Sequence, residues 1–456
     1  MLTWKGVGFA LADFMEIARY ALQRAASLGA DQVEAFLNAG KELVIEVRDG
    51  QVETMKLARD RGLGLRVMVN KCAGFAFTTD LTKTAVEDIV RQAVSNAASA
   101  APDPYRVLPE PASAYPELNL YDPAIRKATV EEKIELARAM ERAARDFDPR
   151  VKIIESAAYH DAEVEVTLVN SRGIQATYQS AYCGLYMSLV AEENNDSQTG
   201  FAMDYRLQYD QLNPVKVGRE AAERAVRMLG AKPVTTRRAA VILEPYVVTG
   251  FLGLLGPGLT AEAVQKNRSP FAGKVGQEVA SPLVNIIDDG ALAGGIASAP
   301  FDGEGVPTGR TVLIEGGILR GFLHNTYTAA RDGVKSTGNG VRGSFKSPPE
   351  VGTTNFFIQP GTISPEDLIR DTQQGLYVTE VLGMHTANPI SGDFSVGAAG
   401  ILIENGQLTR PVRGVAIAGN LLDLLKQVDG VASNLTFFGG RGAPAIRVAG
   451  MSISGH

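Results

Sequence analysis

The chain has 456 residues, of which 45% are hydrophobic and 21% charged, and its formal net charge is −6. These values predict a folded protein of two to four domains, and they argue against a disordered chain or a surface that coats nucleic acid. The only cysteines, Cys72 and Cys183, exclude a disulfide framework and an all-cysteine metal site, and favour a reducing cytoplasm. The first twelve residues resemble neither a signal peptide nor an anchor, and no run of about 18 apolar residues predicts a membrane span.

Residues 1–100 form the first predicted unit, which is of the α+β type. Apolar residues from Phe14 to Ala25 recur at helical spacing, and a second helical pattern covers 82–98. Between the two helices, Asp49-Gly50 and Asn70-Lys71 stand where hairpin turns are needed, and Asp-Gly favours the positive φ angles of a type I′ turn. The strand-like runs are 32–38, 43–48, 52–58, 63–69 and 74–78.

Residues 101–126 are predicted to be a linker, because six prolines in this segment disfavour both helix and central strand. The next unit, 127–231, repeats the outline of the first. Thr129 and Glu132 predict a capping box that opens a helix to about residue 146, and a closing helix covers 214–229. The strand-like runs of this unit are 151–160, 163–169, 174–179, 184–192 and 201–209.

The last predicted domain, 238–456, is rich in glycine and in short β-like runs. Residues 312–319 and 401–408 each predict a hairpin with a Gly-Gly or Asn-Gly turn, and helices are expected at 245–255, 364–374 and 419–428. The predicted fold class is therefore α+β: two helix-flanked antiparallel-sheet units followed by a large β-rich domain, barrel-like or sandwich-like.

Candidate metal ligands are few. The four histidines, His160, His324, His385 and His456, show no helix-spaced pair, so no metal site is predicted in this chain. His160 is expected at a strand end, His324 within a strand and His456 at the terminus. His385 lies in a glycine-bearing loop and is the best placed of the four for a function.

Two kinds of loop could bind a ligand. In 336–343 the glycines allow backbone N–H groups to face a ligand, and Arg342 could pair with a carboxylate, so the peptide-binding candidates are Ser336, Thr337, Asn339 and Arg342. The alternative is a glycine-rich connection between strands. The acidic loops 288–290 and 302–305 lack the full spacing of a calcium loop and are expected to be solvated turns.

Several segments, taken in order, resemble the TldD/PmbA family of metallopeptidases, also called peptidase family U62 or modulators of DNA gyrase. Each segment is weakly specific alone, but their order is specific, and the resemblance covers nearly the whole chain. The segments are VNSRG (169–173), FAGKVGQEVAS (271–281), DDG (288–290), FDGEGVP (301–307), STGNG (336–340), GDFS (392–395), IENG (403–406) and IAGNL (417–421).

One branch of that family, the TldD-like members, carries His-Glu-x-x-x-His on a helix and a later cysteine, which together bind zinc. The corresponding positions here are Pro245, Tyr246 and Gly250, and no cysteine follows Cys183. The resemblance is therefore to the TldE/PmbA-like branch, which lacks the zinc motif. The sequences around 383–395 and 416–420 also resemble this branch.

This resemblance implies a non-catalytic subunit that pairs with a zinc-bearing TldD-like metallopeptidase subunit and encloses unfolded peptide. Zinc is expected on the partner and no cofactor in this chain. The expected state is a dimer or higher oligomer in the cytoplasm, without nucleic-acid or membrane partners. Two alternatives stay open: a stand-alone peptide-binding or scaffolding homodimer, and an autonomous hydrolase using His385, Asp393 and Ser395.

Overall fold

The first layer of the protein is one six-stranded antiparallel sheet. A computed structural model describes residues 11–455, and side chains from Phe14 onward. The strand order β3-β2-β1-β4-β5-β6 joins three strands of the first unit to three of the second through the β1–β4 pair. The strands are β1 (Gln32–Arg48), β2 (Gln51–Val69), β3 (Cys72–Thr78), β4 (Val151–Asn170), β5 (Gln175–Glu193) and β6 (Asp196–Arg206).

These strands are longer than predicted. The sequence predicts a break between 38 and 43, but β1 continues through Gly40, which pairs with Asp60 on one side and Val164 on the other. A ladder on both sides holds the glycine extended despite its weak strand preference. The predicted breaks inside β2, β4 and β5 are also wrong. Residues 161–162 of β4 have a ladder on both sides, residues 59–62 of β2 pair with β1 alone, and residues 180–182 of β5 pair with β4 alone. The turn at Asp49-Gly50 is confirmed, with φ angles of 50° and 70°.

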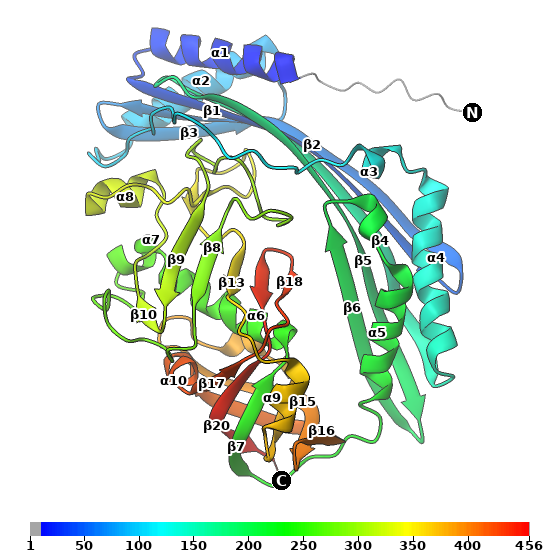
Figure 1. Ribbon diagram of the computed structural model, residues 1–456. Coiled ribbons are helices and arrows are strands. Elements are labelled where there is room, and N and C mark those ends of the chain that lie inside the picture. The colour runs from blue at the N-terminus through cyan, green and yellow to red at the C-terminus, as the bar shows by residue number, and fades with distance from the viewer. Residues whose placement is uncertain (1–10, 456) are drawn as a thin grey trace.

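Helices cover the outer face of this sheet at both ends (Figure 1). One pair of helices packs over the first unit and another over the second, each above its own apolar core. The capping box predicted at Thr129 and Glu132 is present at the start of α4. The helices are α1 (Leu11–Ser27), α2 (Lys83–Ala98), α3 (Pro123–Lys127), α4 (Val130–Phe147) and α5 (Pro214–Val226), with a 3₁₀ turn η1 (Tyr209–Gln211) before α5.

A five-stranded barrel forms the base of the C-terminal region. Its strand order is β16-β15-β14-β7-β20, and β16 closes the circle by pairing with β20, as in Ile417 opposite Ile453. The hairpin predicted at 401–408 is the β15–β16 turn. The barrel strands are β7 (Arg237–Leu243), β14 (Gln374–Leu382), β15 (Asp393–Glu404), β16 (Gln407–Asn420) and β20 (Ile446–Ser454), and β17 (Val428–Val431) pairs with β20 outside the circle.

A second six-stranded sheet, of order β10-β9-β8-β13-β19-β18, stands on the barrel. Its strands are β8 (Ile286–Asp289), β9 (Arg310–Glu315), β10 (Ile318–Leu319), β13 (Phe356–Ile358), β18 (Thr436–Phe438) and β19 (Arg441–Ala443). A separate short pair consists of β11 (Gly340–Val341) and β12 (Glu350–Val351).

Helix α6 packs against strands of both the barrel and this second sheet, and the other short helices of the C-terminal region lie around the two (Figure 1). The predicted helices at 245–255, 364–374 and 419–428 are confirmed as α6 (Pro245–Leu255), α9 (Pro365–Arg370) and α10 (Leu421–Lys426), the last two shorter than predicted. The sequence did not predict α7 (Ala261–Gln265) or α8 (Thr326–Asp332). The 3₁₀ turns are η2 (Gly256–Leu259) and η3 (Met384–Thr386).

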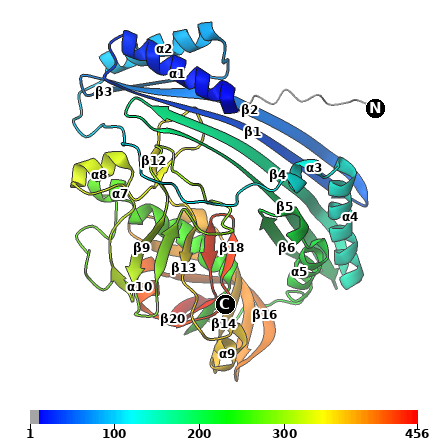
Figure 2. The ribbon, with the colours of Figure 1, turned by 45° about the horizontal axis from the view of Figure 1, so that its top comes forward.

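The long sheet bends around the C-terminal region, so that residues far apart in the sequence meet on its inner side (Figures 1 and 2). The predicted fold class, α+β with helix-flanked antiparallel sheet and a β-rich C-terminal barrel, is confirmed. Within residues 11–455, none of the helices combines the length and apolar character that crossing a membrane requires.

Candidate functional site

A cleft of about 650 Å³ lies between the second unit and the C-terminal region. One wall consists of the end of β6 and of α5 from Lys216 to Arg224, and the other of the start of α6 and the loops 292–296 and 434–439. Pro245 and Tyr246, two positions where the family resemblance places metal-motif residues, line this cleft. Two of the three positions that the resemblance assigns to the metal motif therefore lie at this cleft.

Two aromatic rings contact Tyr246, which lines the cleft. Its ring centroid lies 4.7 Å from that of Phe201 and 5.2 Å from that of Phe438, both in edge-on geometry. Such contacts are favourable for aromatic pairs and fix the position of the side chain. Tyr246 at the start of α6 thus contacts β6 of the opposite wall through Phe201 and β18 of its own wall through Phe438.

The carboxylates of the cleft are paired with arginines. Glu244, directly before α6, lies 3.6 Å from both Arg224 and Arg227. Asp204 on β6 lies 2.7 Å from Arg206. These pairs neutralise most of the negative charge that a cation would need, although one oxygen of Glu244 is buried without a hydrogen-bond partner.

The residues at the start of α6 do not fit the zinc that the family's metallopeptidase description implies. Pro245, Tyr246 and Gly250 offer no nitrogen, sulfur or carboxylate ligand. Gly250 instead faces Met384, since a Cβ added there would lie 3.6 Å from the Met384 Cε atom. Within the described part of the chain, no three His, Cys, Asp or Glu side chains come close enough together to hold a metal ion.

Two strand edges border the cleft. β6 ends the order of the long sheet and β18 ends the order of the second sheet, so each presents an edge that no further strand of its sheet occupies. Residues 203–206 of β6 and 436–438 of β18 line the cleft from opposite walls. An extended peptide can form backbone hydrogen bonds to an edge of this kind without a sequence-specific pocket.

The residues proposed for an autonomous hydrolase are not brought together as a catalytic set. The carboxylate of Asp393 accepts hydrogen bonds from Ser391 Oγ (2.7 Å) and Asn420 Nδ2 (2.9 Å). The bonds from Asn420 and then Ser391 lower the pKa of Asp393. Among residues 11–455, no hydrogen bond joins Asp393, His385 and Ser395 to one another, and all three are exposed. This arrangement lacks the base–nucleophile contact that such a mechanism requires.

The peptide-binding candidates of the 336–342 loop have partners inside the protein. Ser336 and Thr337 donate to the carbonyl oxygen of His324, both at 3.1 Å. Asn339 donates to Asp288 at 2.7 Å. Arg342 is buried and forms an ion pair with Glu34 of β1. As positioned here, the loop connects the C-terminal region to the long sheet and does not line the cleft.

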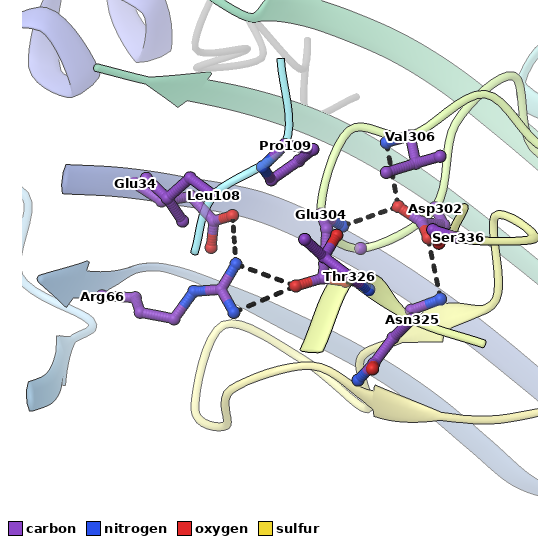
Figure 3. A network of polar contacts seen from close by, with 12 residues as sticks. Glu34, Arg66, Leu108, Pro109, Asp302, Glu304, Val306, Asn325, Thr326 and Ser336 are labelled. Carbon is purple, nitrogen blue, oxygen red and sulfur yellow. Dashed lines mark hydrogen bonds and ion pairs between the residues drawn. The ribbon is translucent and has the colours of Figure 1, made fainter. Parts of the chain in front are cut away.

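Arg66 lies at the centre of this connection (Figure 3). Its guanidinium donates to Glu34 at 2.7 Å and to Glu304 at 3.0 and 3.1 Å. Burial alone would lower the pKa of Arg66, but the two carboxylates outweigh it and hold the pKa above its usual value. The group joins strands β1 and β2 to the loop after β8 by buried, charge-assisted hydrogen bonds.

The expectation that the acidic loops are solvated turns is wrong for three of their carboxylates. Asp288, Asp302 and Glu304 are all buried. Burial, and then the neighbouring Glu304, raise the pKa of Asp302 to about 7. Its carboxylate accepts hydrogen bonds from three backbone N–H groups, which identifies the DGEG segment as a structural loop held against the long sheet. The sequence shows an acidic residue on each side of Gly303, but this pattern did not indicate that the carboxylates of Asp302 and Glu304 are buried.

The remaining histidines and cysteines have structural environments. His160 lies in the middle of β4 and not at a strand end, and its ring contacts Tyr182 and Glu42. His324 precedes α8 and lies outside any strand, which corrects the expectation for it, and His456 lies outside the described residues. Burial raises the pKa of the Cys183 thiol to about 12, which disfavours a thiolate nucleophile.

Comparison with known proteins agrees with this architecture. Family models for the three parts of the PmbA/TldA metallopeptidases match residues 33–97 (domain 1), 123–229 (central domain) and 236–455 (C-terminal domain). The bent long sheet and the C-terminal region with its five-stranded barrel are thus the domains of a metallopeptidase family. The chain belongs to the PmbA/TldD family.

Three relatives illustrate the range of this family. Metalloprotease PmbA from Escherichia coli O157:H7 is 31% identical, covering 90% of this chain and 89% of that one. A protein from Thermotoga maritima, described as a modulator of DNA gyrase, has a TM-score of 0.90 at 29% identity, covering 97% and 100%. TldE from Thermococcus kodakarensis has a TM-score of 0.89 at 25% identity, covering 97% and 100%.

Proposed function

We propose that this chain is a TldE/PmbA-like, non-catalytic subunit of a two-subunit peptidase, and that a TldD-like subunit supplies the zinc. The observation that carries the proposal is the start of α6, where Pro245, Tyr246 and Gly250 stand in a metallopeptidase-family fold without a metal-ligating side chain. The similarity to TldE supports the same reading. Two cysteines without a disulfide partner, Cys72 and Cys183, are consistent with a cytoplasmic protein.

In this proposal the chain contributes a peptide-holding surface. The cleft offers the edges of β6 and β18 for backbone hydrogen bonds, and the aromatic group around Tyr246 for apolar side chains. Recognition through backbone atoms suits unfolded peptides of varied sequence. The net charge of −6 favours peptide over DNA as the ligand. This holds although a structurally similar protein is described as a modulator of DNA gyrase.

The test is a peptidase assay on an unstructured peptide, with this protein alone, a TldD-like subunit from the same source alone, and the mixture. We expect cleavage by the mixture only, with zinc in the partner and below about 0.1 equivalent in this chain, as expected for a site without ligands. Zinc-dependent cleavage by this protein alone would overturn the proposal.

The role of the cleft is tested separately in the mixture. Phe438→Glu places a charge beside Tyr246 in the cleft, and Val275→Glu places the same charge at an exposed position outside the cleft lining. We expect Phe438→Glu to raise KM about tenfold, the cost of losing roughly 1.4 kcal/mol of peptide binding. The zinc content and the Val275→Glu kinetics should be unchanged. An unchanged KM in Phe438→Glu would remove the cleft from the proposal.

A further inference from the structure

A second cavity, of about 570 Å³, lies at the other end of α6 from the cleft. Its walls are the last turn of α6, the turn η2, the helix α7 with the residues after it, the segments 351–353 and 389–390, and one side chain each of β13 and β19. Among the described residues, those that line this cavity are distinct from those that line the cleft. A cavity of this size accommodates a small organic molecule or the end of a peptide.

Apolar side chains form one part of the cavity wall. Leu252 of α6 and Phe356 of β13 are almost fully buried, so each presents only a small part of its surface to the cavity. Val351 also lines it, and so does Ile390, which is 51% exposed. This part of the wall suits an apolar group of a ligand.

Positive charge dominates the rest of the wall. Lys266, Arg268 and Arg441 line the cavity, and Glu262 is the one carboxylate among the described lining residues. Lys266 forms an ion pair with Glu262. In the part of the chain that the structure describes, no carboxylate lies within ion-pair distance of Arg268 or Arg441. The cavity thus keeps two unpaired positive charges, in a chain whose net charge is −6.

Arg441 reaches the cavity over a glycine of α6. A Cβ added at Gly253 would lie 2.2 Å from Arg441 Nη1, so the guanidinium occupies the space that a side chain would fill. The same Nη1 donates one long hydrogen bond, of 3.5 Å, to the carbonyl oxygen of Thr249. Arg441 also stands beside Phe356 in the parallel β13–β19 ladder, which places a charged group next to an apolar one. Glycine inside a helix is unfavourable compared with alanine, and the position of this guanidinium gives the glycine a structural reason.

We propose that the cavity at the end of α6 binds a carboxylate attached to an apolar group, with the carboxylate on the two unpaired arginines and the apolar group on the apolar wall. A guanidinium can bind a carboxylate through two parallel N–H···O bonds. Inorganic phosphate would leave the apolar wall uncovered and would meet the like charge of Glu262. Two sources share the proposed chemistry: the C-terminal residue of a peptide, and a free apolar carboxylic acid. The site is separate from the cleft, so the inference does not rest on the proposed peptidase function.

Fluorescence anisotropy of the full chain with a short labelled peptide tests the site. The probe is an alanine peptide that ends in leucine and carries the label at its N-terminus, and its control is the same peptide with a C-terminal amide. We expect the acid to bind about tenfold more tightly than the amide, because amidation removes the charge that the arginines recognise. N-acetyl-leucine should displace the probe, and the same concentration of inorganic phosphate should not. Equal affinities of N-acetyl-leucine and the peptide would identify a free acid as the ligand, and a tighter peptide would identify a peptide C-terminus.

Substitutions distinguish this cavity from the cleft. Arg268→Gln/Arg441→Gln should weaken binding of the acid probe about 30-fold, through the loss of two charge-assisted contacts. Arg310→Gln, at an exposed arginine outside both cavities, should leave it unchanged. The difference between acid and amide should persist in Phe438→Glu, whose change lies in the cleft. Its disappearance in that variant would place the carboxylate in the cleft and overturn the proposal.

Two glycine variants test the position of Arg441 without removing a charge. Gly253→Ala should weaken the acid probe about fivefold, because the new Cβ displaces the guanidinium. Gly250→Ala is the matched control on the same helix, since a Cβ there would meet Met384 Cε at an ordinary 3.6 Å. Equal binding of acid and amide by the natural chain, equal displacement by phosphate, or full binding by Arg268→Gln/Arg441→Gln would each contradict the proposed site. None of these outcomes depends on peptidase activity.

Discussion

Replacing Arg66 with methionine tests how strongly the long sheet and the C-terminal region depend on each other. The substitution keeps most of the side-chain volume but removes three hydrogen bonds, one to Glu34 and two to Glu304. Glu34 keeps its ion pair with Arg342. Glu304, which is fully buried, keeps only the backbone N–H of Thr326 as a donor to its carboxylate.

The magnitude follows from this inventory. Leaving a buried charge without its partner costs about 3–5 kcal/mol, so we expect Arg66→Met to lower the free energy of unfolding by about 4 kcal/mol. The double variant Arg66→Met/Glu304→Gln removes the stranded charge as well. It should be about 1–3 kcal/mol less destabilised than the sum of the single variants, the usual coupling of residues in one network.

Denaturation in guanidinium chloride at pH 8, followed by circular dichroism and by limited proteolysis, provides the measurement. The contact joins separate parts of the chain, so we expect the transition of Arg66→Met to broaden or split as the C-terminal region separates from the sheet. A change below about 1 kcal/mol, or strict additivity in the double variant, would refute the reasoning.

Three further predictions concern stability. Gly74→Ala should cost about 3 kcal/mol, measured as a lower Tm, because the new Cβ would lie well inside 3.0 Å of the α2 backbone at Ala93 and Ala97. Thr129→Ala removes the N-cap of α4 and should cost about 1 kcal/mol in chemical denaturation. The pKa of Asp302 is about 7 in the folded protein against 3.8 ordinarily, so the folded state holds this proton more tightly. Its contribution to stability is present below pH 4 and lost as the pH rises through 7, and Asp302→Asn should flatten the Tm profile in that window.

Local structure was predictable where neighbouring residues alone decide it. The Asp49-Gly50 turn adopts the positive φ angles that its residue types favour, and the Thr129–Glu132 capping box forms within four residues. The start of α6 was likewise predicted from its sequence. The ordered family segments predicted the family and its overall fold class, and both are confirmed.

The sequence by itself determined where most helices and turns form, and that no histidine stands at the start of α6. Only the tertiary structure decided which strands run on without a break, because β1 is held extended by β2 on one side and by β4, more than 100 residues away in the sequence, on the other. It likewise decided that Glu304 is buried and not solvated, since its partner Arg66 lies 238 residues away in the chain. Burial and pairing depend on which distant segments meet, and local propensities carry no information about that meeting.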